Sequence, residues 1–243
     1  MNTAKEHYDR HLASIYSWMT GSVDAAIERN RVFFRQLELD TVPRGLAIDL
    51  GAGSGFQSIP LAELGFSVVA VDFCSELLSQ LRDRSGSLNL RTVHDDILHF
   101  CDRIDSPAQV IVCMGDTLTH LESVDAVKSL LSDVGRALAE DGILVLTFRD
   151  YVSVELHGTE RFIPVRSDES QILTCFLEYH ERVVQVHDLL YRKEGEQWLL
   201  SVSSYPKLRL NKNWICQQLA EIGLTVHRNE FVHGMICIIA KKS

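Results

Sequence analysis

Short apolar runs alternate with longer stretches of helical periodicity through the middle of the chain. Val, Ile and Leu dominate five of these runs, which predict strands at residues 46–50, 67–72, 90–94, 108–114 and 142–148. Between them the apolar residues fall at helical spacing, most clearly over residues 124–138. Continuous apolar strands separated by helices are typical of a parallel sheet covered on both faces. The pattern predicts an α/β fold with a doubly wound sheet, whose ligands bind beyond the carboxyl ends of the strands.

Two segments depart from this alternation. Residues 1–45 have helical periodicity and predict a cap in front of the first strand. Residues 152–210 have extended character instead and predict an antiparallel insertion after the fifth strand. About three strands are expected in this insertion, at residues 172–179, 182–191 and 197–205.

The sheet is predicted to continue after the insertion. Asn211 is expected to cap a helix that ends at Gly223. Two further strands, at residues 224–228 and 235–240, bring the mostly parallel, Rossmann-like sheet to seven strands. The predicted organisation is a helical cap (1–45), a Rossmann-like core (46–151 and 211–243) and an antiparallel insertion (152–210).

A glycine-rich turn, AIDLGAGSGF, ends the first predicted strand at residues 47–56. Glycines at alternate positions let a ligand approach the backbone, and the following helix offers free N–H groups. The dinucleotide fingerprint GxGxxG would need glycine where Phe56 stands. The turn alone leaves three interpretations open: S-adenosylmethionine (SAM) binding, nicotinamide dinucleotide binding, and an ordinary tight turn.

The order of acidic residues after this turn distinguishes the ligands. An acid followed by GxGxG, with Asp72 ending the second strand and Asp96 following the third, resembles the class I SAM-dependent methyltransferases, small-molecule type, similar to the glycine and sugar N-methyltransferases. Asp95 is the near alternative to Asp96, and residues 113–121 match motif IV of the family. The resemblance implies SAM as cofactor and methylation of a nitrogen or oxygen of a small-molecule acceptor. The cofactor-binding residues it implies are Tyr16, Asp49, Gly51, Ala52, Gly53, Gly55, Asp72, Phe73, Asp95, Asp96, Ile97 and Met114.

Catalytic candidates lie in the motif IV segment. His120 has an intrinsic pKa suited to proton transfer near neutrality, and the alternative is that it orients the loop. Asp116 can contact the acceptor or cap the following helix. Arg149 and Asp150 end the fifth strand at the same face, where they line the pocket or meet solvent. Many members of the resembled family rely on proximity alone, so a dedicated base is not required.

The insertion stands where small-molecule methyltransferases of this family place a lid over the active site. Near its end, Tyr205, Lys207 and Arg209 are expected to alternate outward from Val202 and Leu208 and could meet an acidic acceptor. The alternative is that the insertion packs as an ordinary sheet or pairs with a second copy in a homodimer. Fold and cofactor do not identify the acceptor.

Composition narrows the function classes further. A net charge of −9 disfavours a nucleic-acid partner, because affinity for phosphates rests on clustered Lys and Arg. The absence of a long apolar segment predicts a cytoplasmic protein without a membrane partner. The six cysteines form no CxxC pair, and together with scattered histidines they predict no metal site. The remaining alternatives are a catalytically inactive SAM-binding regulatory module and, more remotely, a nicotinamide-dependent reductase.

Overall fold

The computed structural model describes residues 3–232 and 234–242. Across these residues, the central sheet has seven strands in the order β10-β11-β5-β4-β1-β2-β3, of which β10 and β11 run antiparallel to their neighbours. The strands are β1 (Leu46–Leu50), β2 (Ser67–Asp72), β3 (Leu90–His94), β4 (Ala108–Cys113), β5 (Leu138–Phe148), β10 (Leu224–Val232) and β11 (Met235–Lys242). The predicted seven-stranded, mostly parallel sheet is confirmed.

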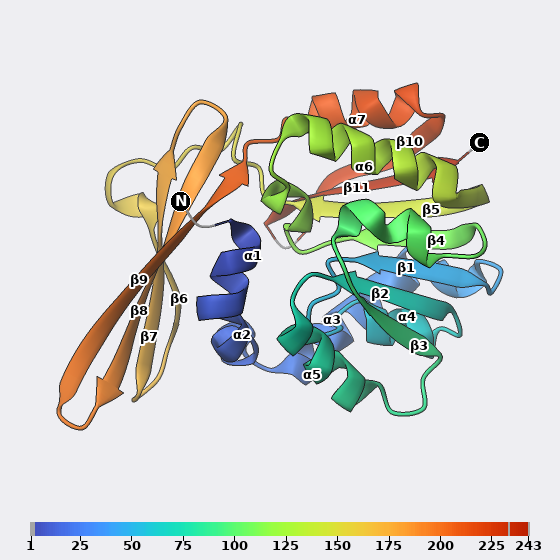
Figure 1. Cartoon of the computed structure of the whole chain (residues 1–243). Helices are drawn as coiled ribbons and strands as arrows, with labels where there is room; N and C mark the ends of the chain where they lie inside the picture. Colours follow the sequence, from blue (N-terminus) through green and yellow to red (C-terminus); the bar gives the residue numbers. More distant parts are fainter. Residues whose placement is uncertain (1–2, 233, 243) are drawn as a thin grey trace.

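Helices cover both faces of this sheet (Figure 1). On the chain before β1 lie α1 (Ala4–His7), the π-helical η1 (Tyr8–Leu12), α2 (Ala13–Thr20), α3 (Val23–Gln36) and η2 (Leu39–Thr41). The crossover and closing helices are α4 (Ser58–Glu63), α5 (Ser75–Ser85), η3 (Ile97–Arg103), η4 (Thr117–His120), α6 (Val124–Ala137) and α7 (Lys212–Glu221). None of the helices in the described ranges is both long enough and apolar enough to cross a membrane.

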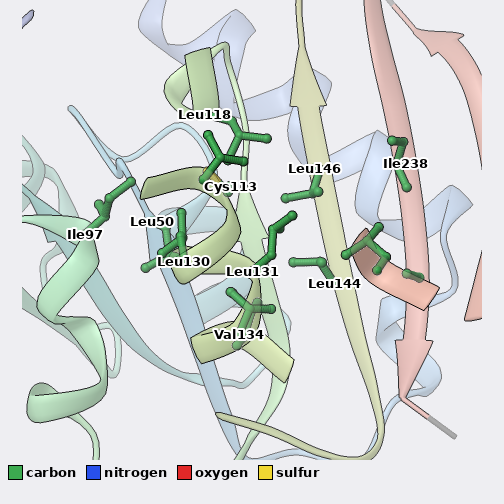
Figure 2. Packing of buried hydrophobic residues seen from close by; sticks show 14 of the residues in the cluster. Leu50, Ile97, Cys113, Leu118, Leu130, Leu131, Val134, Leu144, Leu146 and Ile238 are labelled. Carbon is green, nitrogen blue, oxygen red and sulfur yellow. The ribbon is translucent and has the colours of Figure 1, made fainter. Parts of the chain in front are cut away.

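Helix α6 shows how the local sequence produces this packing. The Ser123 hydroxyl accepts the Ala126 N–H and caps the first turn. The apolar stripe of the helix then packs on the sheet, and Figure 2 shows Leu130, Leu131 and Val134 against Leu144 of β5. Burial of these side chains in one continuous cluster fixes the sheet, and with it the strand ends at which ligands bind.

A second sheet follows β5. It is antiparallel, with the order β6-β7-β8-β9, and within the described ranges it has four strands rather than the three expected. These are β6 (Phe162–Ser167), β7 (Gln171–Tyr179), β8 (Val183–Glu194) and β9 (Gln197–Leu208), preceded by η5 (Gly158–Arg161). The extra strand, β6, was missed because Pro164 argues against a strand, but β6 is an edge strand, where proline is tolerated.

Of the N-terminal helices, α1, η1 and α2 lie between the two sheets (Figure 1). His7 of α1 is fully buried there, with its Nε2 2.9 Å from the Asp188 carboxylate and its Nδ1 2.6 Å from the Ser203 hydroxyl. Its ring stacks on Tyr205 with centroids 4.1 Å apart. These contacts hold the first helix on the second sheet and thereby place η1 and α2 over the carboxyl ends of the central strands.

Candidate functional site

The glycine turn after β1 has a conformation that favours glycine at each of three positions. Gly51, Gly53 and Gly55 have φ values of 79°, 50° and 92°. The Gly51 and Ala52 N–H groups both donate to the carbonyl of Val71, which folds the turn onto the end of β2. A Cβ on Gly51 would lie 2.4 Å from the Thr117 side chain, so the turn also lies directly against η4.

Asp72 lies at the end of β2 beside this turn. One carboxylate oxygen accepts the Gly53 N–H at 2.8 Å, and the other accepts the Cys74 N–H at 2.7 Å. Burial raises the pKa of the Asp72 carboxyl, and these two hydrogen bonds oppose that effect. A carboxylate has about four acceptor sites, so Asp72 keeps capacity for hydroxyl groups of a ligand.

Three cavities meet around these strand ends. The loop cavity, of about 90 Å³, lies over the glycine turn, and the β3 cavity, of about 540 Å³, lies over the end of β3. The inter-sheet cavity, of about 320 Å³, lies between the central sheet and the second sheet. Predicted cofactor residues that line the loop or β3 cavity are Tyr16, Gly51, Ala52, Gly53, Asp72, Phe73, Asp95, Asp96, Ile97 and Met114.

The two acidic residues after β3 have different surroundings. Asp95 pairs with Arg103 at 2.5 Å and with His99, and these bonds lower the pKa of its carboxyl to about 2. Asp96 is exposed, and one of its oxygens caps η3 by accepting the Leu98 N–H at 2.9 Å. The Asp96 carboxylate thus has fewer partners within the protein than that of Asp95 and more capacity to accept hydrogen bonds from a ligand.

Asp49 and Gly55 lie behind the turn and line none of the three cavities just described. The buried Asp49 carboxylate accepts the Ser58 hydroxyl, and burial raises its pKa to about 7, with a smaller contribution from the charge of Asp72. A Cβ on Gly55 would lie 2.2 Å from Leu81. Both residues therefore shape the turn from behind, and their predicted role in cofactor binding stays a prediction.

His120 lines all three of these cavities. Its ring lies near Tyr8 and Tyr205, with centroids 5.7 Å and 5.6 Å away. Burial, together with the positive charge of Lys207, lowers the pKa of His120 to about 3, so the imidazole is neutral. Its Nε2 is buried and has no hydrogen-bond partner among the residues that the structure describes. A buried polar atom of this kind points to a ligand that supplies the missing partner.

Asp116 is the centre of a buried polar cluster. Its carboxylate accepts the Lys207 ammonium at 2.6 Å, the Arg149 backbone N–H at 3.0 Å, the Thr119 hydroxyl at 3.0 Å and the Tyr151 hydroxyl at 3.2 Å. Burial raises the pKa of Asp116, but the charge of Lys207 and the hydrogen bonds from Lys207 and the Arg149 N–H, together with His120, outweigh burial, so the pKa is lowered. An ionised carboxylate with this many donors orders the η4 segment and is poorly suited to accept a proton.

Lys207 is the residue of this cluster that sequence reasoning placed least well. Lys207 and Tyr205 were expected to point outward from the insertion. In the structure both side chains are buried, and Val202 of the same strand is exposed. The reason is that the last part of β9 packs on α1 and η4, whereas its first part projects away (Figure 1). Asp116 holds Lys207 charged, because it raises the pKa of the ammonium above its ordinary value despite burial.

Comparison with known proteins agrees with this geometry. Residues 47–142 match the family described as "Methyltransferase domain". The glycine/sarcosine N-methyltransferase of Aphanothece halophytica is 35% identical over 106 residues, which are 43% of this chain and 40% of that protein. The chain therefore spans about two-fifths of the length of this curated relative.

Solved structures match over nearly the whole chain. The CcbJ methyltransferase of Streptomyces caelestis has a TM-score of 0.79 at 15% identity, covering 98% of this chain and 99% of its own. CalS10, an amino pentose methyltransferase of Micromonospora echinaspora, has a TM-score of 0.76 at 15% identity, covering 95% and 96%. The chain has the fold of the class I SAM-dependent methyltransferases, and its residues 47–142 match the methyltransferase domain family. The family predicted from the glycine turn and its acids is confirmed.

Proposed function

We propose that this chain transfers a methyl group from SAM to a nitrogen or oxygen of a small-molecule acceptor. The observation that carries the proposal is the position of His120, where the loop and β3 cavities open onto the inter-sheet cavity. A methyltransferase needs such a junction, because donor and acceptor must meet in line while water is excluded. The curated relative and CalS10 are named for methyl transfer to small molecules.

The residues around the loop and β3 cavities fit SAM. Asp72 would accept the ribose hydroxyls, Asp96 and Ile97 would hold adenine, and the turn at Gly51 would hold the methionine end. Gly115 lines both the loop and inter-sheet cavities, and a Cβ added to it would meet nothing within 4 Å, which supports an open passage between them. SAM carries a sulfonium and no phosphate, so these carboxylates meet no phosphate charge.

The chain's own side chains would orient the acceptor. SAM supplies a methyl group on a sulfonium: the sulfur–carbon bond breaks, a nitrogen–carbon or oxygen–carbon bond forms, and the electron pair stays on sulfur. The neutral His120 Nε2 would accept a hydrogen bond from the acceptor N–H or O–H and orient it. Because the lowered pKa of His120 makes it a weak base, the acceptor's proton would leave to solvent after transfer. The Asp116–Lys207 pair would hold η4 and thus His120 in place.

The two alternatives fit less well. A regulatory module without an acceptor site would fill the space over η4 with side chains, but the inter-sheet cavity of about 320 Å³ lies there. A nicotinamide dinucleotide site would need glycine at position 56 for the GxGxxG turn that holds the pyrophosphate, and this chain has Phe56 there. Neither alternative therefore has an observation in its favour.

Calorimetric titration with SAM and with its demethylated product, S-adenosylhomocysteine (SAH), tests the proposal. Asp72→Ala should weaken binding by about 30- to 800-fold, since a buried hydrogen-bonded carboxylate contributes about 2 to 4 kcal/mol. Asp83→Ala removes the same charge from an exposed position of α5 and should leave binding unchanged. Absence of binding below roughly millimolar concentration in the wild type, or equal affinity in Asp72→Ala, contradicts the proposal.

We further propose that the chain forms a homodimer in a reducing compartment such as the cytoplasm. β9 is an edge strand, and its exposed first part carries Trp198, Leu200 and Val202 on one face, a feature that supports pairing with a second copy. None of the six cysteines, all of which lie within the described residues, forms a disulfide. Light scattering on the wild type and on Leu200→Lys tests pairing: a monomeric wild type, or a dimer insensitive to Leu200→Lys, speaks against it.

A further inference from the structure

The wall of the inter-sheet cavity is largely apolar. Leu12 and Met19 come from the N-terminal helices, and the second sheet adds aliphatic side chains from three strands. Those side chains are Ile163 and Val165 of β6, Leu177 of β7 and Val186 of β8. Apolar atoms that face a cavity lack the packing contacts that they would make in a filled core. An apolar ligand in the cavity would supply those contacts.

Most charged groups at this cavity already have partners within the protein. Asp116 and Lys207 bond each other, and Asp188 lies 2.9 Å from His7 and accepts the Cys175 thiol at 2.8 Å. Arg149 is the charged group at this cavity that could still pair with an acidic ligand, because its Nε is as far as 3.9 Å from Asp116. However, 53% of the Arg149 side chain is exposed. It offers a positive charge at the rim of the cavity and not in its interior.

We propose that the acceptor carries an apolar body that fills this wall, and that glycine and sarcosine are not acceptors. This inference rests on the proposed function. Glycine has no side chain to cover the aliphatic residues of β6, β7 and β8, and its two charges would enter a space whose own charges are paired. The cavity, at about 320 Å³, falls within the range of roughly 300–1,000 Å³ typical of pockets for larger small molecules.

Titration of the SAH-saturated protein with two homologous probe series tests the inference. The series are n-alkylamines and n-alkanols from ethyl to octyl, with glycine and sarcosine for comparison. In at least one series the affinity should rise about fourfold per methylene until the cavity is filled. Glycine and sarcosine should give neither binding heat at millimolar concentration nor SAH release with SAM. A flat affinity or no binding in both series, or saturable turnover of glycine, overturns the inference.

Two variants locate the effect in the cavity wall. Leu177→Gln should reduce octyl-probe affinity at least tenfold, whereas Leu199→Gln, the same change at an exposed position of β9, should not. Val165→Thr changes polarity with little change of shape and serves if Leu177→Gln does not fold. Equal losses in the wall variants and Leu199→Gln also overturn the inference. Failure of SAH itself to bind would instead contradict the proposed function, and the probe series is then titrated into the free protein.

Discussion

Replacement of Lys207 by Met should destabilise the protein more than any comparable change of an exposed lysine. Lys207 is 9% exposed and Asp116 is 2% exposed, and their charged atoms lie 2.6 Å apart. Lys207 belongs to β9 and Asp116 to the segment just before η4, so the pair joins the second sheet to the central sheet. Met keeps most of the side-chain volume and removes the charge, which leaves Asp116 as a buried carboxylate without its cation.

The size of the effect follows from two opposing contributions. At an effective dielectric constant near 20, two unit charges 2.6 Å apart attract by about 6 kcal/mol. Desolvation of both ions offsets much of this in the intact pair, but removal of one partner of a buried pair costs about 3 to 5 kcal/mol, because the other stays uncompensated. Thr119, Tyr151 and Arg149 still donate to Asp116, so we expect a loss at the lower end, about 3 kcal/mol.

Urea unfolding at two pH values provides the assay. In the wild type the lowered pKa of Asp116 means that its contribution is present above the unfolded-state pKa and is lost as pH falls through the folded-state pKa. In Lys207→Met burial dominates and raises the pKa of Asp116, so the variant loses stability as pH rises. The deficit should therefore be larger at about pH 8 than at about pH 5.

A matched control is Lys193→Met, at an exposed position of β8 in the same sheet, which should change stability by less than about 0.5 kcal/mol. Equal losses in Lys193→Met and Lys207→Met would refute the buried ion pair. A deficit in Lys207→Met that does not depend on pH would refute the assignment of the effect to Asp116.

Three further outcomes are expected. Because burial raises the pKa of Asp49 to about 7, the folded state binds a proton at Asp49 that the unfolded state has already lost, and the free energy of unfolding falls as pH rises toward 7. Asp49→Asn should remove this contribution to the pH dependence of urea unfolding. Gly51→Ala should lower the free energy of unfolding by about 1 to 3 kcal/mol, and Gly223→Ala should lower it less, as urea unfolding can measure. Both glycines have φ near 80°, but only Gly51 lacks space for a Cβ. Asp96→Asn should weaken SAM binding in calorimetry more than Asp95→Asn, whose carboxylate is already paired; the reverse order would contradict the assignment.

The central sheet could be predicted because its signals are local. Strands β1, β2 and β3 have the predicted bounds. β1 and β2 are short, mostly apolar runs, whereas β3 is marked only by Leu90 and Val93 within a more polar segment. The strand β5 begins earlier than expected, at Leu138, because its first residues include Glu140 and Asp141, which are poor strand formers. Those two residues are exposed and precede the buried part of the strand, so no apolar run in the sequence marks this first part of β5.

The second sheet was less predictable because a pleated strand shows its faces only once its neighbours are known. Val202 and Lys207 belong to the same strand, yet the apolar residue is exposed and the charged one buried. Helix α1 and η4 cover one end of β9 and leave the other end exposed. Local alternation of polarity carries no information about which end a distant segment covers.

The candidate site divides in the same way. Its cofactor side consists of residues next to strand ends, such as Gly51, Asp72 and Asp96, which a local motif identifies. Its acceptor side depends on pairs such as Asp116 with Lys207 and His7 with Asp188, separated by 91 and 181 residues. Such pairs form only when the N-terminal helices and the second sheet close on the central sheet. A shared cofactor motif is therefore compatible with different acceptors, because the residues that would select an acceptor come from the segments outside the motif.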